Sequence, residues 1–301
     1  MIQVKNLTKT FDGFKALDSL NLHVPKGAVY GLVGPNGSGK STVIRHILGS
    51  YIPDEGTVEV AGQPVWENPG VKALMGNIPD DFYFPVSADM NEMKKHYQSF
   101  YPAFDGQRFE KLAEIFTSID RKKPIRSFSK GMQKQAAFWL VMSCRPQVLI
   151  LDEPVDGLDP VMRRQVWSVL LSDVAENGTT VLVSSHNLRE LEDVCDHVGI
   201  LYKGRMLLER SLDELQNNIV KVQIAMGPDQ ELEPLPQEFT LLHQTTLGRV
   251  HTLIVRGEQE KIRQTLAARN PVVLDLLPLS LEEIFIYELG GQDDGIKEIL
   301  V

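Results

Sequence analysis

The chain has 301 residues, which is more than one hydrophobic core usually needs, so we expect one large domain and one small one. Its 43% hydrophobic and 24% charged content is that of an ordinary globular protein, and its formal net charge of −9 disfavours nucleic acid as a partner. No apolar run approaches the roughly 18 residues of a membrane-spanning helix, and the first residues lack the apolar stretch of a signal peptide. We therefore expect a cytoplasmic protein that meets a membrane only through a partner.

Three buried strands are predicted from short apolar runs over residues 28–33, 147–151 and 179–183. A helical pattern runs from Lys40 to Leu48, where Gly49 stops it. Helical segments also precede or follow the other two strands. Because strands that alternate with helices need crossover connections, the sequence predicts an α/β fold with a largely parallel sheet.

Residues 88–119 have a mostly helical pattern with breaks near Pro102 and Gly106, and we interpret about 85–145 as an inserted helical subdomain. The segment 80–104 holds seven of the chain's 22 aromatic residues. Most of these rings are expected in the subdomain core, but a small subdomain buries few large rings and exposed rings often mark an interface. Some of five residues are therefore predicted to line an exposed groove: Phe82, Tyr83, Phe84, Tyr97 and Phe100.

The composition changes near Asn217, and turn residues follow it. Beyond the turns, residues 250–255 resemble a strand and residues 258–269 a helix. We therefore predict a large domain over residues 1–216 and a small α+β domain over residues 217–301.

Residues 34–41 (GPNGSGKS) match the phosphate-binding pattern G-x-x-x-x-G-K-[ST] between a predicted strand and a predicted helix. The glycines let the backbone curl so that N–H groups point at phosphate oxygens, and the helix N-terminus adds its positive dipole. Lys40, which we expect in a surface loop, can reach the β- and γ-phosphates, and the Ser41 hydroxyl can bind Mg²⁺. The alternative is a glycine-rich turn without a ligand. The predicted nucleotide-binding residues are Asn36, Gly37, Ser38, Gly39, Lys40, Ser41 and Thr42.

Two carboxylates follow the predicted strand 147–151. Asp152 is placed to hold Mg²⁺, and Glu153 is placed to orient and deprotonate an attacking water. His186 ends the next predicted strand, where it can contact the γ-phosphate. Alone, the carboxylates would be solvated charges before Pro154 and the histidine an ordinary strand-end residue. Beside a phosphate-binding loop, the catalytic interpretation is favoured.

Residues 127–133 (SFSKGMQ) are similar to the signature motif of ABC proteins in its S-K-G-M variant. With the other motifs in this order, residues 1–215 resemble the ATP-binding subunit of an ABC transporter. In that family Ser129 and the Gly131 N–H would form an anion site at a helix N-terminus, facing the γ-phosphate bound to the other subunit. The resemblance implies that two chains, identical or related, enclose two ATP molecules head to tail. Without it, the segment would be a polar loop that caps a helix over residues 130–144.

The resemblance implies further roles for single residues. Phe11, five residues before Ala16, takes the place of the aromatic residue that stacks on adenine, and Asp159 lies in the loop that follows the dimer interface. Asp80 stands where the family usually has Gln or Glu; it can still meet Mg²⁺ or its water, but its link to the membrane partner is an open question. The implied metal ligands are thus Ser41, Asp80 and Asp152, and the implied catalytic residues are Glu153 and His186.

Residues 278–285 resemble the S-L-E-x-x-F ending of bacterial drug- and peptide-export ATPases. The implied function is ATP hydrolysis that powers transport, with a preference for export, through separate transmembrane permease subunits. The implied location is the cytoplasmic face of the cell membrane.

Three other functions fit parts of the sequence. A non-transport ABC ATPase of DNA repair or translation would carry a long coiled coil or two cassettes, whereas this chain has one phosphate-binding loop and an acidic C-terminal region. A small-molecule kinase would need neither the signature motif nor a water-activating carboxylate. A nucleotide-gated regulatory module would bind ATP tightly with slow or absent turnover.

Overall fold

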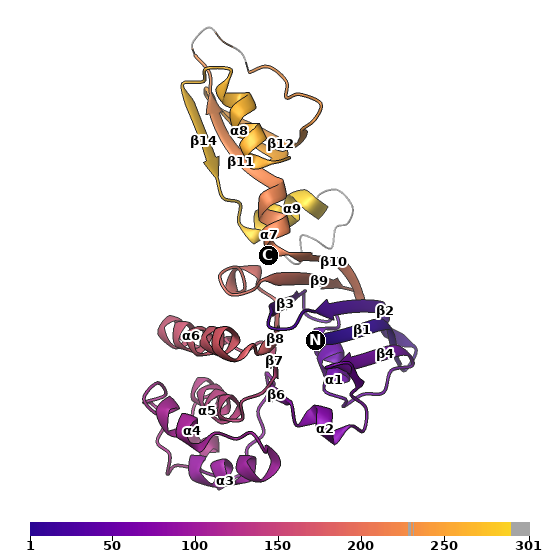
Figure 1. The fold of residues 1–301 in the computed structure, drawn as a ribbon, viewed down its shortest axis with the longest axis vertical. Coiled ribbons are helices and arrows are strands. Elements are labelled where there is room, and N and C mark those ends of the chain that lie inside the picture. The colour runs from indigo at the N-terminus through magenta and orange to yellow at the C-terminus, as the bar shows by residue number, and fades with distance from the viewer. Residues whose placement is uncertain (228–229, 231, 290–301) are drawn as a thin grey trace. The chain divides into compact units, whose positions relative to one another are not determined.

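The computed structural model describes residues 1–227, 230 and 232–289 (Figure 1). These residues form two compact units. One consists of Met1–His186 with Val194–Glu209, and the other of Asn187–Asp193 with the described residues from Arg210 onward. Residues 290–301, which end the predicted C-terminal domain, lie outside the described residues. Within the described part of the chain, no helix combines the length and apolar character needed to cross a bilayer.

The centre of the first unit is a six-stranded sheet of order β10-β9-β3-β8-β7-β6. Its strands are β3 (Val29–Val33), β6 (Met75–Ile78), β7 (Val148–Asp152), β8 (Thr180–Ser185), β9 (His197–Tyr202) and β10 (Arg205–Ser211). The pairings among β3, β6, β7, β8 and β9 are all parallel, which confirms the predicted α/β sheet. Because β3, β7 and β8 are neighbours, the segments that follow their carboxyl ends meet at one edge of the sheet.

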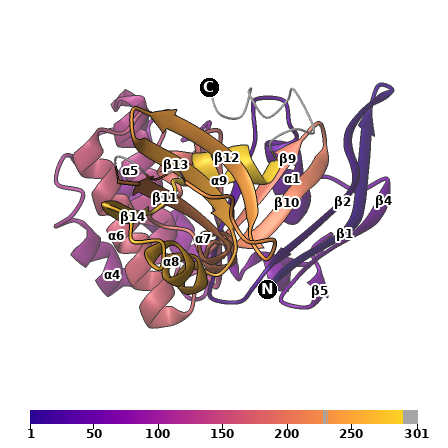
Figure 2. The same ribbon diagram turned by 90° about the horizontal axis from the view of Figure 1, so that it is seen from above.

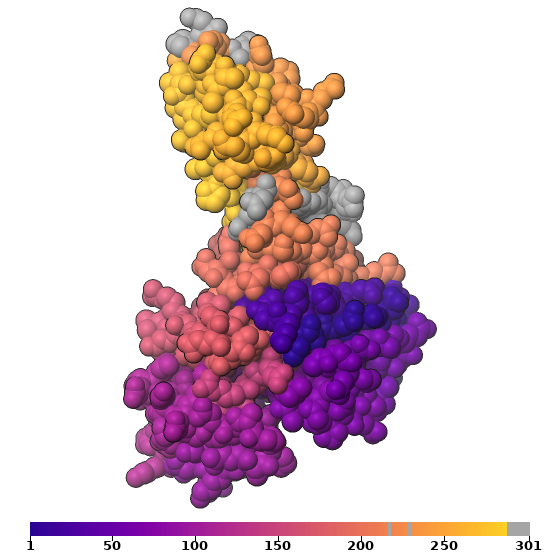
Figure 3. Space-filling model, viewed as in Figure 1, coloured from indigo at the N-terminus to yellow at the C-terminus, as the bar shows by residue number. Residues whose placement is uncertain are grey.

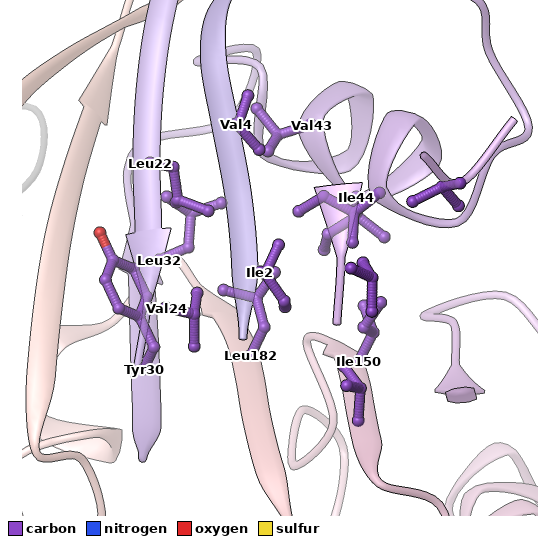
Figure 4. Close-up of a cluster of buried hydrophobic side chains, with 14 of the residues drawn as sticks. Ile2, Val4, Leu22, Val24, Tyr30, Leu32, Val43, Ile44, Ile150 and Leu182 are labelled. Atoms are coloured by element: carbon purple, nitrogen blue, oxygen red, sulfur yellow. The ribbon is translucent and has the colours of Figure 1, made fainter. Parts of the chain in front are cut away.

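A second, antiparallel sheet was not predicted from the sequence. It has the order β2-β1-β4-β5 and consists of β1 (Ile2–Phe11), β2 (Phe14–Val24), β4 (Glu55–Val60) and β5 (Gln63–Pro64) (Figure 2). Apolar residues of β1 and β2 face those of the central sheet, with helix α1 (Lys40–Ile47) closing the layer (Figure 4). Ile2, Leu22 and Leu182 are at most 1% exposed in this core. The core fixes α1, and thus the phosphate-binding loop, against the sheet edge.

Helices fill the segment between β6 and β7. They are α3 (Met90–Phe100), α4 (Gly106–Leu112), the short helix η1 (Ile125–Ser127) and α5 (Lys130–Ser143), while α2 (Pro69–Lys72) precedes β6 and α6 (Pro160–Asn177) follows β7. Trp139 packs on Phe109 and Phe116, and its indole N–H donates to the Phe109 carbonyl at 2.6 Å. These three rings form the aromatic core of the helical segment, whose surface is drawn in purple and magenta in Figure 3. Several rings of segment 80–104 therefore remain nearer the surface.

The second unit is an α+β unit, as predicted. Its antiparallel sheet has the order β12-β13-β11-β14. Its elements are η2 (Leu188–Glu190), α7 (Leu212–Asn218), β11 (Ile219–Ala225), β12 (Thr240–Leu247), β13 (Val250–Arg256), α8 (Gln259–Ala267), β14 (Val273–Leu277) and α9 (Leu281–Leu289). The S-L-E-x-x-F segment starts α9, where Leu281 and Phe285 are buried and Glu282 pairs with Arg189 at 2.8 Å.

Candidate active site

The phosphate-binding loop runs from β3 into α1. Gly37 and Gly39 have φ values of 79° and 112°, in the left-handed region that favours glycine. Gly39 precedes α1 and supplies no side-chain cap, so the first N–H groups of the helix are directed at the loop. A loop of this kind, ending at a helix N-terminus, can hold a phosphate through backbone N–H groups.

Lys40 lies in the first turn of α1 and is 6% exposed. The expectation that it lies in a surface loop was therefore wrong. The ammonium folds back and donates to the Gly34 carbonyl at 2.6 Å, and it lies 3.7 Å from Glu153 Oε1. Burial lowers the pKa of Lys40, and the carboxylates of Glu153 and Asp152 partly offset this shift.

Asp152 is the last residue of β7 and Glu153 follows it, and Ser184 of the neighbouring strand holds both. The Ser184 hydroxyl donates to Asp152 Oδ1 at 2.5 Å, and the Glu153 N–H lies 3.2 Å from both oxygens of Ser184. Glu153 Oε2 is 3.0 Å from Nδ1 of His186. Burial raises the pKa of the Glu153 carboxyl, and Lys40 and His186 offset part of that rise. A carboxylate of raised pKa next to a phosphate-binding loop is suited to accept a proton from water.

A cavity of about 410 Å³ joins these groups. The size falls within the usual range for small-molecule sites. Its lining contains the predicted residues Phe11, Asn36, Gly37, Ser38, Gly39, Lys40, Ser41, Thr42, Asp80, Asp152 and Glu153. His186 is not part of the lining but reaches the cavity through its contact with Glu153. The fold thus assembles in one place residues from four separate segments of the chain.

The predicted Mg²⁺ ligands Ser41, Asp80 and Asp152 all line this cavity. They offer only oxygen atoms, which are the donors that Mg²⁺ prefers beside phosphate oxygens and water. No group of three or more His, Cys, Asp or Glu side chains suited to a metal occurs among the described residues. The donors therefore fit a magnesium ion that completes its shell with nucleotide phosphates and water.

Three predicted nucleotide contacts do not reach the cavity of their own chain. Ser129 Oγ accepts the Met132 N–H at 3.3 Å and caps α5, while Asp159 Oδ1 accepts two N–H groups at the start of α6. Gly131, in the first turn of α5, is likewise not part of the lining. Within one chain these residues serve as helix starts.

Phe14 and Lys134 are among the residues at the site that were missed from the sequence. Phe14 also lines the cavity, pairs with Phe11 across the tight β1–β2 turn and is 69% exposed. The Asp12-Gly13 turn signal could have found this hairpin. Lys134 of α5 is fully buried and donates to the carbonyl of Glu153 at 2.7 Å. A lysine ahead of an apolar helical run gave no sign of that contact.

A second cavity of about 540 Å³ lies between α2 and α3. Its lining residues are Pro69, Lys72, Ala73, Met93, His96, Tyr97, Phe100 and Tyr101. The predicted aromatic groove is thus confirmed for Tyr97 and Phe100. The other three residues, Phe82, Tyr83 and Phe84, do not belong to the lining, and Phe84 is buried in the core with 5% exposure.

Comparisons with known proteins show the family of the chain. The family model described as "ABC transporter" matches residues 17–156. The ABC transporter ATP-binding protein YtrB of Bacillus subtilis is 32% identical over 97% of this chain and 99% of its own length. The Nod factor export ATP-binding protein I of Cupriavidus metallidurans is 30% identical over 97% of this chain and 98% of its own. A solved dimeric structure of a bacterial ABC transporter cassette, 22% identical, superposes with a TM-score of 0.63 over 70% of this chain and 99% of its own. The chain belongs to the ABC transporter family, as an ATP-binding subunit that hydrolyses ATP to power transport.

Proposed function

We propose that this subunit drives an exporter, using Mg²⁺-bound ATP in the cavity between the phosphate-binding loop and the acidic pair. The observation that carries the proposal is that Lys40, Asp152 and Glu153 line one cavity while His186 contacts Glu153. Export is supported by the similarity to the Nod factor export ATP-binding protein I. The kinase, regulatory and non-transport alternatives do not fit a chain of this family with this site.

In the proposed mechanism, backbone N–H groups of the phosphate-binding loop and of the first turn of α1 hold the phosphates, and Lys40 balances their charge. A bound Mg²⁺ supplies further charge neutralisation, and Ser41, Asp80 and Asp152 would hold it. Glu153 orients a water molecule, whose oxygen attacks the γ-phosphorus while its proton passes to the carboxylate. The bond from the γ-phosphorus to the bridging oxygen breaks, so that ADP and phosphate leave.

His186 keeps the Glu153 carboxylate in place. Phe11 and Phe14 offer rings for the adenine.

Cassettes of this family dimerise and work with transmembrane subunits. We propose the head-to-tail arrangement, in which Ser129 and Gly131 of one chain complete the site of the other. Both residues start α5 and lie outside the cavity of their own chain, which leaves the N-terminal turn of α5 for a phosphate of a partner's nucleotide. Two copies of this chain or two related chains satisfy this geometry.

Mixing two inactive variants is expected to restore hydrolysis. A Lys40→Ala chain keeps its signature segment and a Ser129→Arg chain keeps its phosphate-binding loop, so the heterodimer has one intact composite site. ATPase activity of the mixture should recover to a measurable fraction of the wild-type rate, while each variant alone stays inactive.

The control for this mixture is a chain with both substitutions mixed with the Lys40→Ala chain, which has no intact site. Because Ser129 caps α5, its loss costs about 1 kcal/mol, so both variants are checked by thermal melting. An inactive mixture that nevertheless dimerises with ATP would contradict the head-to-tail arrangement.

We further propose that the groove between α2 and α3 receives a short helix of the transmembrane subunit, which places this chain at the cytoplasmic face of the membrane. Phe100 is 65% exposed in the groove, although it is a large aromatic side chain. Aromatic side chains at such positions commonly anchor protein interfaces. Asp80 lies ahead of this segment in the chain and lines the nucleotide cavity, so the segment joins the two sites.

Phe100→Asp is expected to abolish transport while leaving the basal ATPase rate of the isolated subunit within about twofold, because surface charge far from the nucleotide has little effect on the fold. The measurements are ATPase assays of the isolated chain and transport in vesicles with the co-purified permease. Leu247→Asp, which charges an apolar side chain of β12 that is 86% exposed, serves as the control. Normal transport by Phe100→Asp would show that the groove is not the docking site.

A further inference from the structure

Lys134 is a fully buried lysine whose ammonium contacts the segment that follows β7. It lies on α5 with 0% exposure. Its Nζ donates to the carbonyl of Glu153 at 2.7 Å and to that of Asp156 at 2.9 Å. A buried ammonium is expensive unless hydrogen bonds and an opposite charge satisfy it. Two carbonyls on one short turn supply the hydrogen bonds here.

Asp80 supplies the opposite charge. Its Oδ1 lies 3.4 Å from Nζ of Lys134 and equally far from Nζ of Lys130. This oxygen is buried and accepts no hydrogen bond, although the rest of the carboxylate is partly exposed in the nucleotide cavity. The ion pair therefore connects the cavity wall to the interior of α5. It also gives a physical reason for Asp at position 80, since the neutral Gln usual in the family would leave Lys134 without a counter-ion.

The backbone that Lys134 holds is strained. Glu153 has φ of 47°, in the left-handed region that a non-glycine residue rarely adopts. Ser184 holds the N–H side of this residue at 3.2 Å, and Lys134 holds its carbonyl side. Helix α5 also packs closely on the turn that follows Glu153. A Cβ atom at Gly131 of this helix would lie only 3.2 Å from the carbonyl oxygen of Gly157. The direction of the Glu153 side chain, 3.7 Å from Lys40 and 3.0 Å from His186, depends on this backbone conformation.

We propose that Lys134 is a positioning residue for ATP hydrolysis, which with Asp80 as counter-ion fixes the left-handed backbone at Glu153. The pair connects the Mg²⁺ side of the cavity to the carboxylate that activates water. Lys134 is not part of the cavity lining, so it acts through Glu153. This inference rests on the proposed catalytic role of Glu153.

The test compares steady-state kinetics of three variants. Lys134→Met keeps the length of the side chain but removes the charge and the donors. It should lower kcat by about 10- to 100-fold, the effect of misplacing a reacting group by about 1 Å, while the KM for ATP changes less than about threefold. Asp80→Asn should lower kcat by a smaller factor. In the Lys134→Met chain, Asp80→Asn should lower kcat by a smaller factor than in the wild-type chain, because the effects of coupled residues are not additive and only the role of Asp80 toward Mg²⁺ remains.

Lys94→Met is the matched control, since Lys94 also pairs with a carboxylate on a helix, Glu110 at 2.7 Å, but away from the cavity. It should keep the wild-type kcat. The proposal is overturned if Lys134→Met, shown to be folded by circular dichroism, has a wild-type kcat. It is also overturned if Asp80→Asn lowers kcat by the same factor in the wild-type chain and in the Lys134→Met chain. Asp80 would then act only as a ligand of Mg²⁺ and not through Lys134.

Two further outcomes are decisive. If Lys134→Met does not fold, Asp80→Asn tests the ion pair instead, because the partly exposed side chain of Asp80 tolerates the change. An unchanged kcat in Asp80→Asn would then overturn the proposed role of the pair. Glu153→Gln is assayed in parallel. Full activity in Glu153→Gln would refute the proposed catalytic role, whereas an inactive Glu153→Gln beside a fully active Lys134→Met would refute only the inference on Lys134.

Discussion

Glu153→Gln is expected to lower the ATPase rate by about 10²–10⁴-fold, the range that a positioned general base contributes. The amide keeps the shape of the side chain and can keep a contact with His186, but it cannot take a proton from water. ATP binding should persist because Lys40 and the phosphate-binding loop are unchanged. The variant should therefore accumulate as an ATP-bound dimer, which size-exclusion chromatography with and without ATP would detect.

The fold of Glu153→Gln is expected to remain intact. Burial raises the pKa of Glu153, so the ionised carboxylate is disfavoured in the folded protein, and a neutral amide should leave Tm unchanged or slightly higher. Glu110→Gln, another glutamate that forms ion pairs, is the control and should hydrolyse ATP at the wild-type rate. A Glu153→Gln chain that stays monomeric with ATP and turns over normally would assign the base to another residue.

Lys40→Ala is expected to lower kcat by about 10²–10³-fold, the loss typical for removing one preorganised stabilising group. ATP binding should weaken as well, because Lys40 brings a positive side-chain charge into the phosphate cavity. Both effects are measured by steady-state hydrolysis and by titration with a fluorescent ATP analogue.

Burial of Lys40 requires a second variant. Lys40→Met fills the space of the aliphatic stem, so it separates the loss of charge from the loss of packing. Both variants should be inactive while Lys40→Met keeps the wild-type Tm. Lys221→Ala removes a lysine that pairs with Glu283 in the second unit and should leave turnover unchanged. Near-normal activity in folded Lys40→Met would exclude the phosphate-binding role.

The sequence by itself determined the parts of this protein that depend on local order. The buried strands predicted over residues 28–33, 147–151 and 179–183 correspond to β3, β7 and β8. Their apolar composition indicates burial on both faces, which is typical of a parallel sheet with both faces covered. The phosphate-binding loop, the acidic pair and His186 follow these strands directly. Their meeting at one edge was therefore predictable.

Only the tertiary structure decided contacts between residues that are distant along the chain. The antiparallel sheet β2-β1-β4-β5 brings Phe11 and Phe14 to the cavity, and its pairing of residues 2–8 with residues 55–60 leaves no local pattern. Phe84 and Phe100 come from the same aromatic segment, yet one is buried and the other exposed, because packing around Trp139 fills the core with other rings. The contact of Lys134 with Glu153 spans 19 residues and joins a helix to a turn. Composition and spacing describe neighbours along the chain, whereas a buried charge finds its partners only when the chain has folded around it.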